Sequence, residues 1–152
     1  MARTCGRYVV RDDTIQMFYG MVSGPHAGPK HPKEQIVRQH PASLGSGTLR
    51  RDGFVSLSSG DESGVALTRP FRVAGTRLYV NADVAADGEL WIRLCSQTPE
   101  PVPEIVHSPI IRGNHTRYEV SWPGLVWSTQ QGELRRLEFH LRRADLYSWW
   151  FE

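Results

Sequence analysis

The sequence predicts an all-β protein: an antiparallel two-sheet β-sandwich of jelly-roll type, preceded by an N-terminal β-hairpin and a long loop. Three observations support this fold class. Apolar and polar residues alternate with a period of two in several segments, which is typical of strands that bury one face. Glycine and proline, at 14 and 10 positions, supply frequent turns between these segments. No segment sustains the apolar period of a helix.

The N-terminal part of the chain combines a hairpin with a loop. Residues 6–22 predict two strands joined by a turn at Asp12 and Asp13, because these two acidic residues separate apolar and aromatic runs. Residues 23–46 contain several prolines and glycines and predict a long loop, which in a compact domain is usually functional or disordered. We therefore divide the chain into residues 1–46, the hairpin and loop, and residues 47–152, the β-sandwich.

The predicted sandwich consists of short strands separated by turns. Its strands are expected at residues 54–57, 64–68, 77–83, 89–94, 117–122 and 135–142, and the chain ends at residues 146–151 in a segment dense in aromatics. Asp87 and Gly88 predict a hairpin turn between the third and fourth of these strands. That turn would make the two strands neighbours in one sheet.

Composition excludes several classes of function. A net charge of +2 on 152 residues gives no strong field for nucleic acid, and no nucleic-acid-binding motif is present. No apolar run reaches transmembrane length, and the first residues lack the apolar core of a signal peptide. The two cysteines, Cys5 and Cys95, lack metal-ligand spacing and do not form a disulfide framework. We therefore expect no membrane or nucleic-acid partner and no cofactor, while the compartment stays open.

Aromatic residues give the most useful indication of a binding site. If the two central strands are neighbours, Tyr79 and Asn81 share a face with Trp91 and Arg93, within side-chain reach across the strands. Aromatic rings stack on the C–H faces of sugars, and the polar groups pair with sugar hydroxyls. These four residues therefore predict a carbohydrate-binding strip, with Trp127 as a further candidate contact in a loop. Alternatively, a second layer covers this face and makes it part of the core.

Histidines offer a weaker candidate site. His26, His31 and His40 lie in the Gly/Pro-rich loop, and three imidazoles are a possible ligand set for zinc or copper. Metal sites, however, usually hold their ligands on rigid elements. The alternative is a solvent-exposed loop that binds no metal. His140 alternates with charged residues and predicts a solvated strand face.

Acidic residues do not predict a catalytic pair. Glycoside hydrolysis needs two carboxylates that flank one bond. Asp12 with Asp13, and Asp61 with Glu62, are adjacent in sequence and lie in predicted turns, where consecutive side chains commonly diverge. We also find no nucleophile motif around a serine or cysteine. No catalytic residue is therefore predicted.

A string of motifs from residue 49 onward resembles a known module. The motifs are the segments 49–57 (LRRDGFVSL), 61–64, 71–94, 108–113, 120–122 and 137–151. They are similar to the C-terminal β-sandwich module of bacterial proteins related to five-bladed β-propeller glycoside hydrolases. Residues 8–24 are similar to a hairpin of the last propeller blade. The resemblance implies a module without the catalytic carboxylates, which belong to earlier blades, that packs against a propeller and in some cases contributes to sugar binding or oligomer contacts.

These observations lead to one leading hypothesis and two alternatives. The leading hypothesis is a non-catalytic accessory module related to glycoside hydrolases, which binds carbohydrate or packs against another domain. The first alternative is a self-assembling structural protein, because apolar residues of the hairpin such as Ile15, Met17 and Phe18 favour association of copies. The second is a small metal-dependent enzyme that uses His26, His31 and His40.

Overall fold

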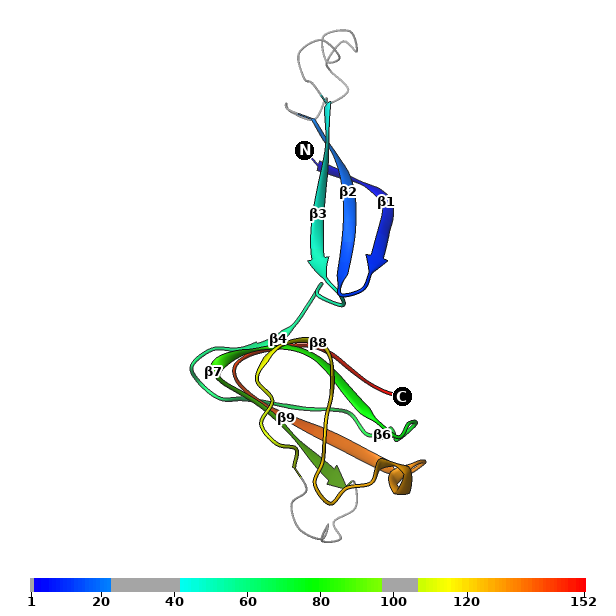
Figure 1. Cartoon of the computed structure of the whole chain (residues 1–152), viewed down its shortest axis with the longest axis vertical. Coiled ribbons are helices and arrows are strands. Elements are labelled where there is room, and N and C mark those ends of the chain that lie inside the picture. The colour runs from blue at the N-terminus through cyan, green and yellow to red at the C-terminus, as the bar shows by residue number, and fades with distance from the viewer. Residues whose placement is uncertain (1, 23–41, 97–106) are drawn as a thin grey trace. The chain divides into compact units, whose positions relative to one another are not determined.

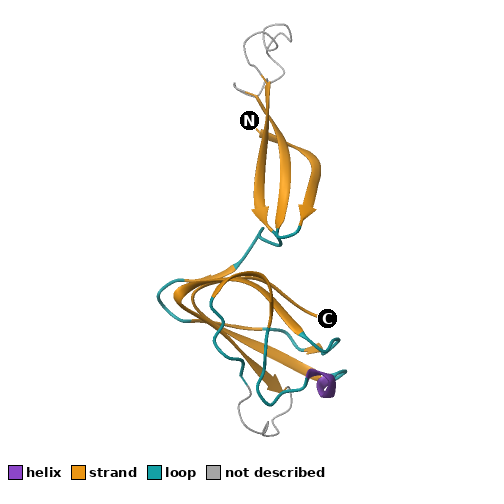
Figure 2. Cartoon of the chain, viewed as in Figure 1, coloured by secondary structure: helices purple, strands orange, loops and turns teal. Residues whose placement is uncertain are grey.

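The structure confirms an all-β antiparallel fold of the sandwich type (Figure 1, Figure 2). It is a computed structural model that describes residues 2–22, 42–96 and 107–152. Contacts divide the chain into two compact units, Met1–Arg51 and Asp52–Glu152. The division falls at Arg51 and not at residue 46, because residues 42–50 form a strand with the N-terminal hairpin.

Each unit contains one antiparallel sheet. The first unit contains β1 (Ala2–Arg11), β2 (Thr14–Val22) and β3 (Ala42–Arg50). The second contains β4 (Leu57–Ser59), β5 (Gly64–Leu67), β6 (Phe71–Arg72), β7 (Leu78–Ser96), β8 (Gly113–Glu119), the 3-10 helix η1 (Trp127–Gln130) and β9 (Leu134–Phe151). The predicted hairpin of residues 6–22 is present as β1 and β2, with its turn at Asp12 and Asp13.

Strand β3 was not expected, because its sequence is rich in glycine and serine and does not alternate. The structure gives a physical reason for one of these glycines. A Cβ atom at Gly45 would lie 2.7 Å from the ring of Tyr19 on β2, so the ring needs the space that glycine leaves. Glycine within a strand can mark such a close approach, so a glycine-rich segment is not necessarily a loop.

One face of the three-stranded sheet is apolar. The strand register brings Val10 and Leu49 to either side of Ile15, and Tyr8 beside Met17. Ile15 is 4% exposed and is the one buried apolar residue among the described side chains of this unit. Its neighbours Tyr8 and Val10 are exposed. We call this surface the apolar face of the three-stranded sheet.

Strands β7 and β9 pair along most of their length and bend together, as Figure 1 shows. The rings of Phe139 and Trp149, at two distant points of β9, have centroids 6.1 Å apart. Residues this far apart on a straight strand would be separated by about 33 Å. The register is interrupted between Val84 and Glu89, opposite Arg143, whose φ is 48°. The two halves of the paired strands therefore face each other as the layers of the sandwich.

The core of the second unit lies between these two halves. Apolar residues from both halves of β7 and of β9 form one buried cluster, and η1 and the segment before it close one side. The central members are Val80, Ala82, Val84, Leu90, Ile92, Leu94, Leu137, Phe139, Leu141 and Leu146. The predicted alternation therefore identifies core positions on both sides of the bend.

The predicted hairpin turn at Asp87 and Gly88 is wrong. Strand β7 continues through both residues and pairs with β9 on either side of them. The Asp-Gly pair instead accompanies the bend, where a Cβ at Gly88 would lie 2.6 Å from the carbonyl oxygen of Arg143. A local turn signal shows that the backbone changes direction, but not that the chain reverses.

Candidate functional site

Two of the five predicted sugar contacts are buried in the first half of β7. Tyr79 and Asn81 are 1% and 0% exposed. The Tyr79 ring stacks on Trp150 with centroids 5.6 Å apart, and its hydroxyl donates to Glu119 at 3.1 Å. The guanidinium of Arg117 lies 4.1 Å from the centre of the same ring. The structure thus corrects the predicted strip, because Tyr79 and Asn81 are enclosed.

Trp127 is also enclosed. It begins η1 and packs edge-on against Trp122 and Phe151, with ring centroids 5.1 Å and 4.9 Å away. Its indole N–H is buried without a hydrogen-bond partner among the described residues. The predicted contact of Trp127 with a ligand is corrected, because this ring is part of the core.

Trp91 and Arg93 lie in the second half of β7, on the face that points away from the core. Strand β9 pairs with β5 on one side and with β7 on the other. Side chains of cross-strand partners therefore lie in rows on this surface. The segment at residue 107 continues it beyond β7 through a bridge to Arg93. We call this surface the outer face; its members are Val65, Leu67, Glu138, His140, Trp91, Arg93 and His107.

The centre of the outer face is a stack of rings. Trp91 and His140 are cross-strand partners whose rings are nearly parallel, 7° apart, with centroids separated by 3.5 Å. His107 meets the indole edge-on at 5.7 Å. No described residue accepts a hydrogen bond from the Trp91 indole N–H, whereas the Trp150 N–H donates to Glu152 at 3.1 Å. The stack therefore fixes the orientation of the Trp91 ring against His140 and His107, and its indole N–H has no hydrogen-bond partner among the described residues.

A charged row lies directly beside the ring stack. Arg93 donates to Glu138 at 2.6 Å, and His140 Nε2 lies 2.5 Å from the other oxygen of the same carboxylate. Partial burial acts to raise the pKa of the Glu138 carboxyl, but the hydrogen bonds from Arg93 and His140 outweigh it and hold this pKa below 4.5. The hydrogen bond to Glu138 raises the pKa of the Arg93 guanidinium in turn. Glu138 is therefore an ionised hydrogen-bond acceptor at neutral pH.

Further groups extend the outer face along the strands. Glu89 pairs with Arg142 at 3.1 Å on one side of the ring stack. On the other side, Cys95 is the cross-strand partner of Arg136. No hydrogen bond or ion pair to a described residue engages Arg136, and its Nε is buried. The face as a whole offers cationic donors, one aromatic stack and two carboxylates that are each paired with an arginine. This combination suits a neutral, polyhydroxylated ligand.

Sequence reasoning found Trp91 and Arg93 but missed the residues that hold them. From the sequence, His140 and the charged residues that alternate with it predict only a solvated strand face. The signal that identifies them is the alternation of residues 135–142, which puts Glu138 and His140 on one face of β9. That alternation becomes a site only once β9 is known to pair with residues 89–96 of β7.

The predicted histidine site lies outside the described residues. His26, His31 and His40 all belong to residues 23–41, so the metal hypothesis stays a prediction. Across the part of the chain that the structure describes, no group of three or more His, Cys, Asp or Glu side chains is placed to hold a metal ion. Likewise, no described helix is long and apolar enough to span a membrane.

Comparisons with known proteins bring no further assignment. Models of known families, curated proteins and solved structures were all compared with this chain, and none of them matches it. We therefore infer function from the geometry of the outer face and of the three-stranded sheet.

Proposed function

We propose that this chain is a non-catalytic accessory module that binds carbohydrate on the outer face of its β-sandwich. The observation that carries the proposal is the partly exposed Trp91 ring, stacked on His140 and flanked by the Arg93–Glu138 ion pair. A sugar presents C–H groups to an aromatic ring and hydroxyls to charged donors and acceptors. Aromatic residues with a polar atom are favoured at surfaces that bind partly apolar ligands.

The charge arrangement supports binding without hydrolysis. A glycoside hydrolase needs one carboxylic acid that is protonated at working pH and a second, ionised carboxylate across the scissile bond. On the outer face, Glu138 accepts from Arg93 and His140, and its lowered pKa keeps it ionised. Glu89 is paired with Arg142. Neither carboxylate is thus placed as a proton donor, which agrees with the accessory role that the motifs of residues 49–151 imply.

Isothermal titration against a panel of plant and microbial polysaccharides tests the proposal. We expect wild-type protein to bind at least one of them, and Trp91→Ala to weaken that binding at least tenfold. Phe54→Ala, at an exposed aromatic of the same unit, serves as the matched control and leaves affinity unchanged. Absence of binding to the whole panel, or equal effects of the two variants, contradicts the proposal.

A second candidate function is packing against another protein surface, either a neighbouring domain or another copy of this chain. The apolar face of the three-stranded sheet favours it, because Tyr8 and Val10 are exposed beside Ile15. An exposed apolar sheet face of this kind commonly marks an association surface. Light scattering of wild type and of Met17→Lys tests self-association, with Gln16→Lys on the opposite face as control. A monomeric wild type excludes self-assembly and leaves domain packing.

A further inference from the structure

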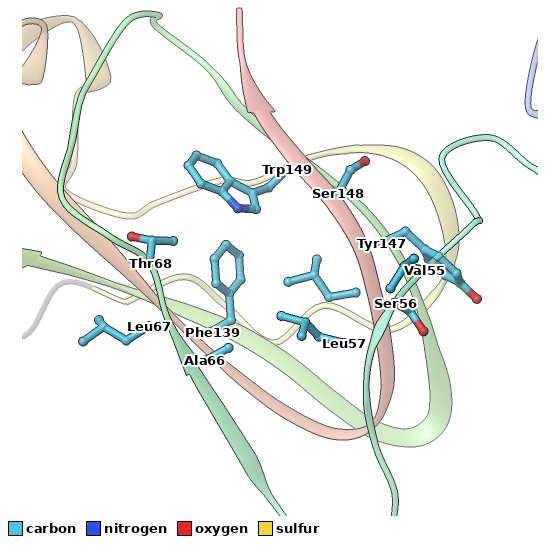
Figure 3. Close-up of a pocket in the computed structure, with 11 residues that line it drawn as sticks. Val55, Ser56, Leu57, Ala66, Leu67, Thr68, Phe139, Tyr147, Ser148 and Trp149 are labelled. Carbon is cyan, nitrogen blue, oxygen red and sulfur yellow. The ribbon is translucent and has the colours of Figure 1, made fainter.

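The β-sandwich also has a concave surface, which shares Leu67 with the outer face but is otherwise lined by different residues. A groove of about 430 Å³ opens between β4, with the residues before it, and the end of β5 (Figure 3). Its apolar lining includes Leu57, Ala66, Leu67, Phe139, Leu146 and Trp149. The volume falls within the range of about 300–1,000 Å³ that is typical of small-molecule sites.

The walls of the groove come from both layers of the sandwich. Phe139 and Trp149 belong to opposite halves of β9 and lie together, with Leu57 facing them (Figure 3). Trp149 is held in place by Phe71 and Phe151, whose ring centroids lie 5.1 Å and 6.3 Å away. Phe139 is buried in the core. The groove is therefore an opening into the apolar interior with rigid aromatic walls.

Three hydroxyls of the lining are already bonded within the protein. Ser56 donates to Asp145 at 3.2 Å, and Ser148 donates to Asp52 at 3.0 Å. The Thr68 hydroxyl accepts from the Leu137 amide at 3.0 Å. None of the lining side chains carries a charge. A charged or polyhydroxylated ligand would lose its hydration here without gaining equivalent hydrogen bonds, which disfavours it.

We propose that this groove is a binding site for a neutral, predominantly apolar small molecule, such as an alkyl chain or an aromatic ring system. Three properties select this class: the uncharged lining, the engaged hydroxyls and the volume. Leu57 and Leu67 are exposed at the rim, so an apolar ligand would remove both from water together with the inner rings. This proposal does not depend on carbohydrate binding, since the groove and the outer face differ in chemistry.

Fluorescence titration with the neutral probe N-phenyl-1-naphthylamine tests the site, with its sulfonated analogue 1-anilinonaphthalene-8-sulfonate as the charged comparison. We expect saturable binding of the neutral probe, at least tenfold tighter than that of the analogue, with energy transfer from tryptophan. Leu57→Lys is expected to weaken the neutral probe at least tenfold. Val126→Lys is the matched control, because Leu57 and Val126 are similarly exposed, at 55% and 60%, and Val126 belongs neither to the groove lining nor to the outer face.

Several outcomes would overturn this proposal. Equal binding of the neutral probe by wild type and Leu57→Lys would place the probe elsewhere, for example on the apolar face of the three-stranded sheet. Equally tight binding of the sulfonated analogue would show that the uncharged lining does not select neutral ligands. A wild-type dimer that Leu57→Lys converts to monomer, with no probe binding, would assign the groove to a second copy. Leu57→Gln repeats the test without adding a charge, should the lysine variant fold poorly.

Discussion

The three-stranded sheet and the β-sandwich are built from the same kind of antiparallel strand but bury their apolar residues differently. In the sandwich, the bend of β7 and β9 brings two apolar faces together, and nearly all buried apolar residues of the described chain lie between them. In the three-stranded sheet, Ile15 alone is buried among the described side chains, and it is covered from the side by strand neighbours. Apolar alternation produces a core only where a second layer opposes the first.

This difference fits the two different tasks proposed for the two units. The sandwich has its own core, so its outer face is free to carry polar groups for a ligand. The three-stranded sheet has an exposed apolar face and little core, which favours association of that face with another surface. The comparison therefore supports the proposed binding role of the sandwich and the proposed packing role of the three-stranded sheet.

The largest expected effect comes from core truncation and tests the comparison directly. Phe139→Ala removes a buried ring that both layers contact, and we expect it to lower the free energy of unfolding by about 3–5 kcal/mol. Urea unfolding followed by tryptophan fluorescence is the measurement, because all five tryptophans lie in the sandwich. Ile15→Ala should change the free energy of unfolding of the sandwich by no more than about 0.5 kcal/mol. Equal shifts would mean that the two units unfold as one.

An intermediate effect is expected at the bend, which the three-stranded sheet lacks. A Cβ at Gly88 would lie 2.6 Å and 2.8 Å from the carbonyl oxygens of Arg143 and Arg142, so the backbone must shift. We expect Gly88→Ala to cost about 1–3 kcal/mol in the same unfolding experiment. Gly60→Ala is the control, since no atom lies within 4 Å of its added Cβ. A neutral Gly88→Ala would show that the bend tolerates the displacement.

Local pattern was enough to predict the strands of the sandwich but not their connections. Residues 89–94 and 135–142 alternate as expected because a core lies on one side of them. Asp87 and Gly88 were misinterpreted because the same dipeptide suits a hairpin and a bend, and only the distant strand β9 decides between them. Local pattern also failed to indicate β3, in which Gly45 makes room for the ring of Tyr19.

The candidate site could also be predicted only in part, because local pattern does not show which strands pair. The polar positions around Trp91 and Arg93 follow from alternation, and both residues lie on the outer face. Tyr79 has the same alternation phase, but Trp150 and Arg117 cover it from strands distant in sequence. His140 stacks on Trp91 through a pairing that no local signal specifies. Which side chains meet across strands is therefore set by strand order, which depends on the whole fold.

The smallest expected effect is electrostatic and sharpens the account of the outer face. Arg93 and His140 hold the pKa of Glu138 below 4.5 in the folded chain, so the ionised carboxylate stabilises the fold. This contribution is complete above the unfolded value and is lost as the pH falls through the lower folded value. Glu138→Gln should thus cost no more than about 1 kcal/mol at pH 7, and its difference from wild type should shrink below pH 4.5. Urea unfolding between pH 3 and 7 measures this difference, with Glu62→Gln as an exposed control. A difference that stays constant with pH would show that the contacts of Glu138 with Arg93 and His140 do not stabilise the fold.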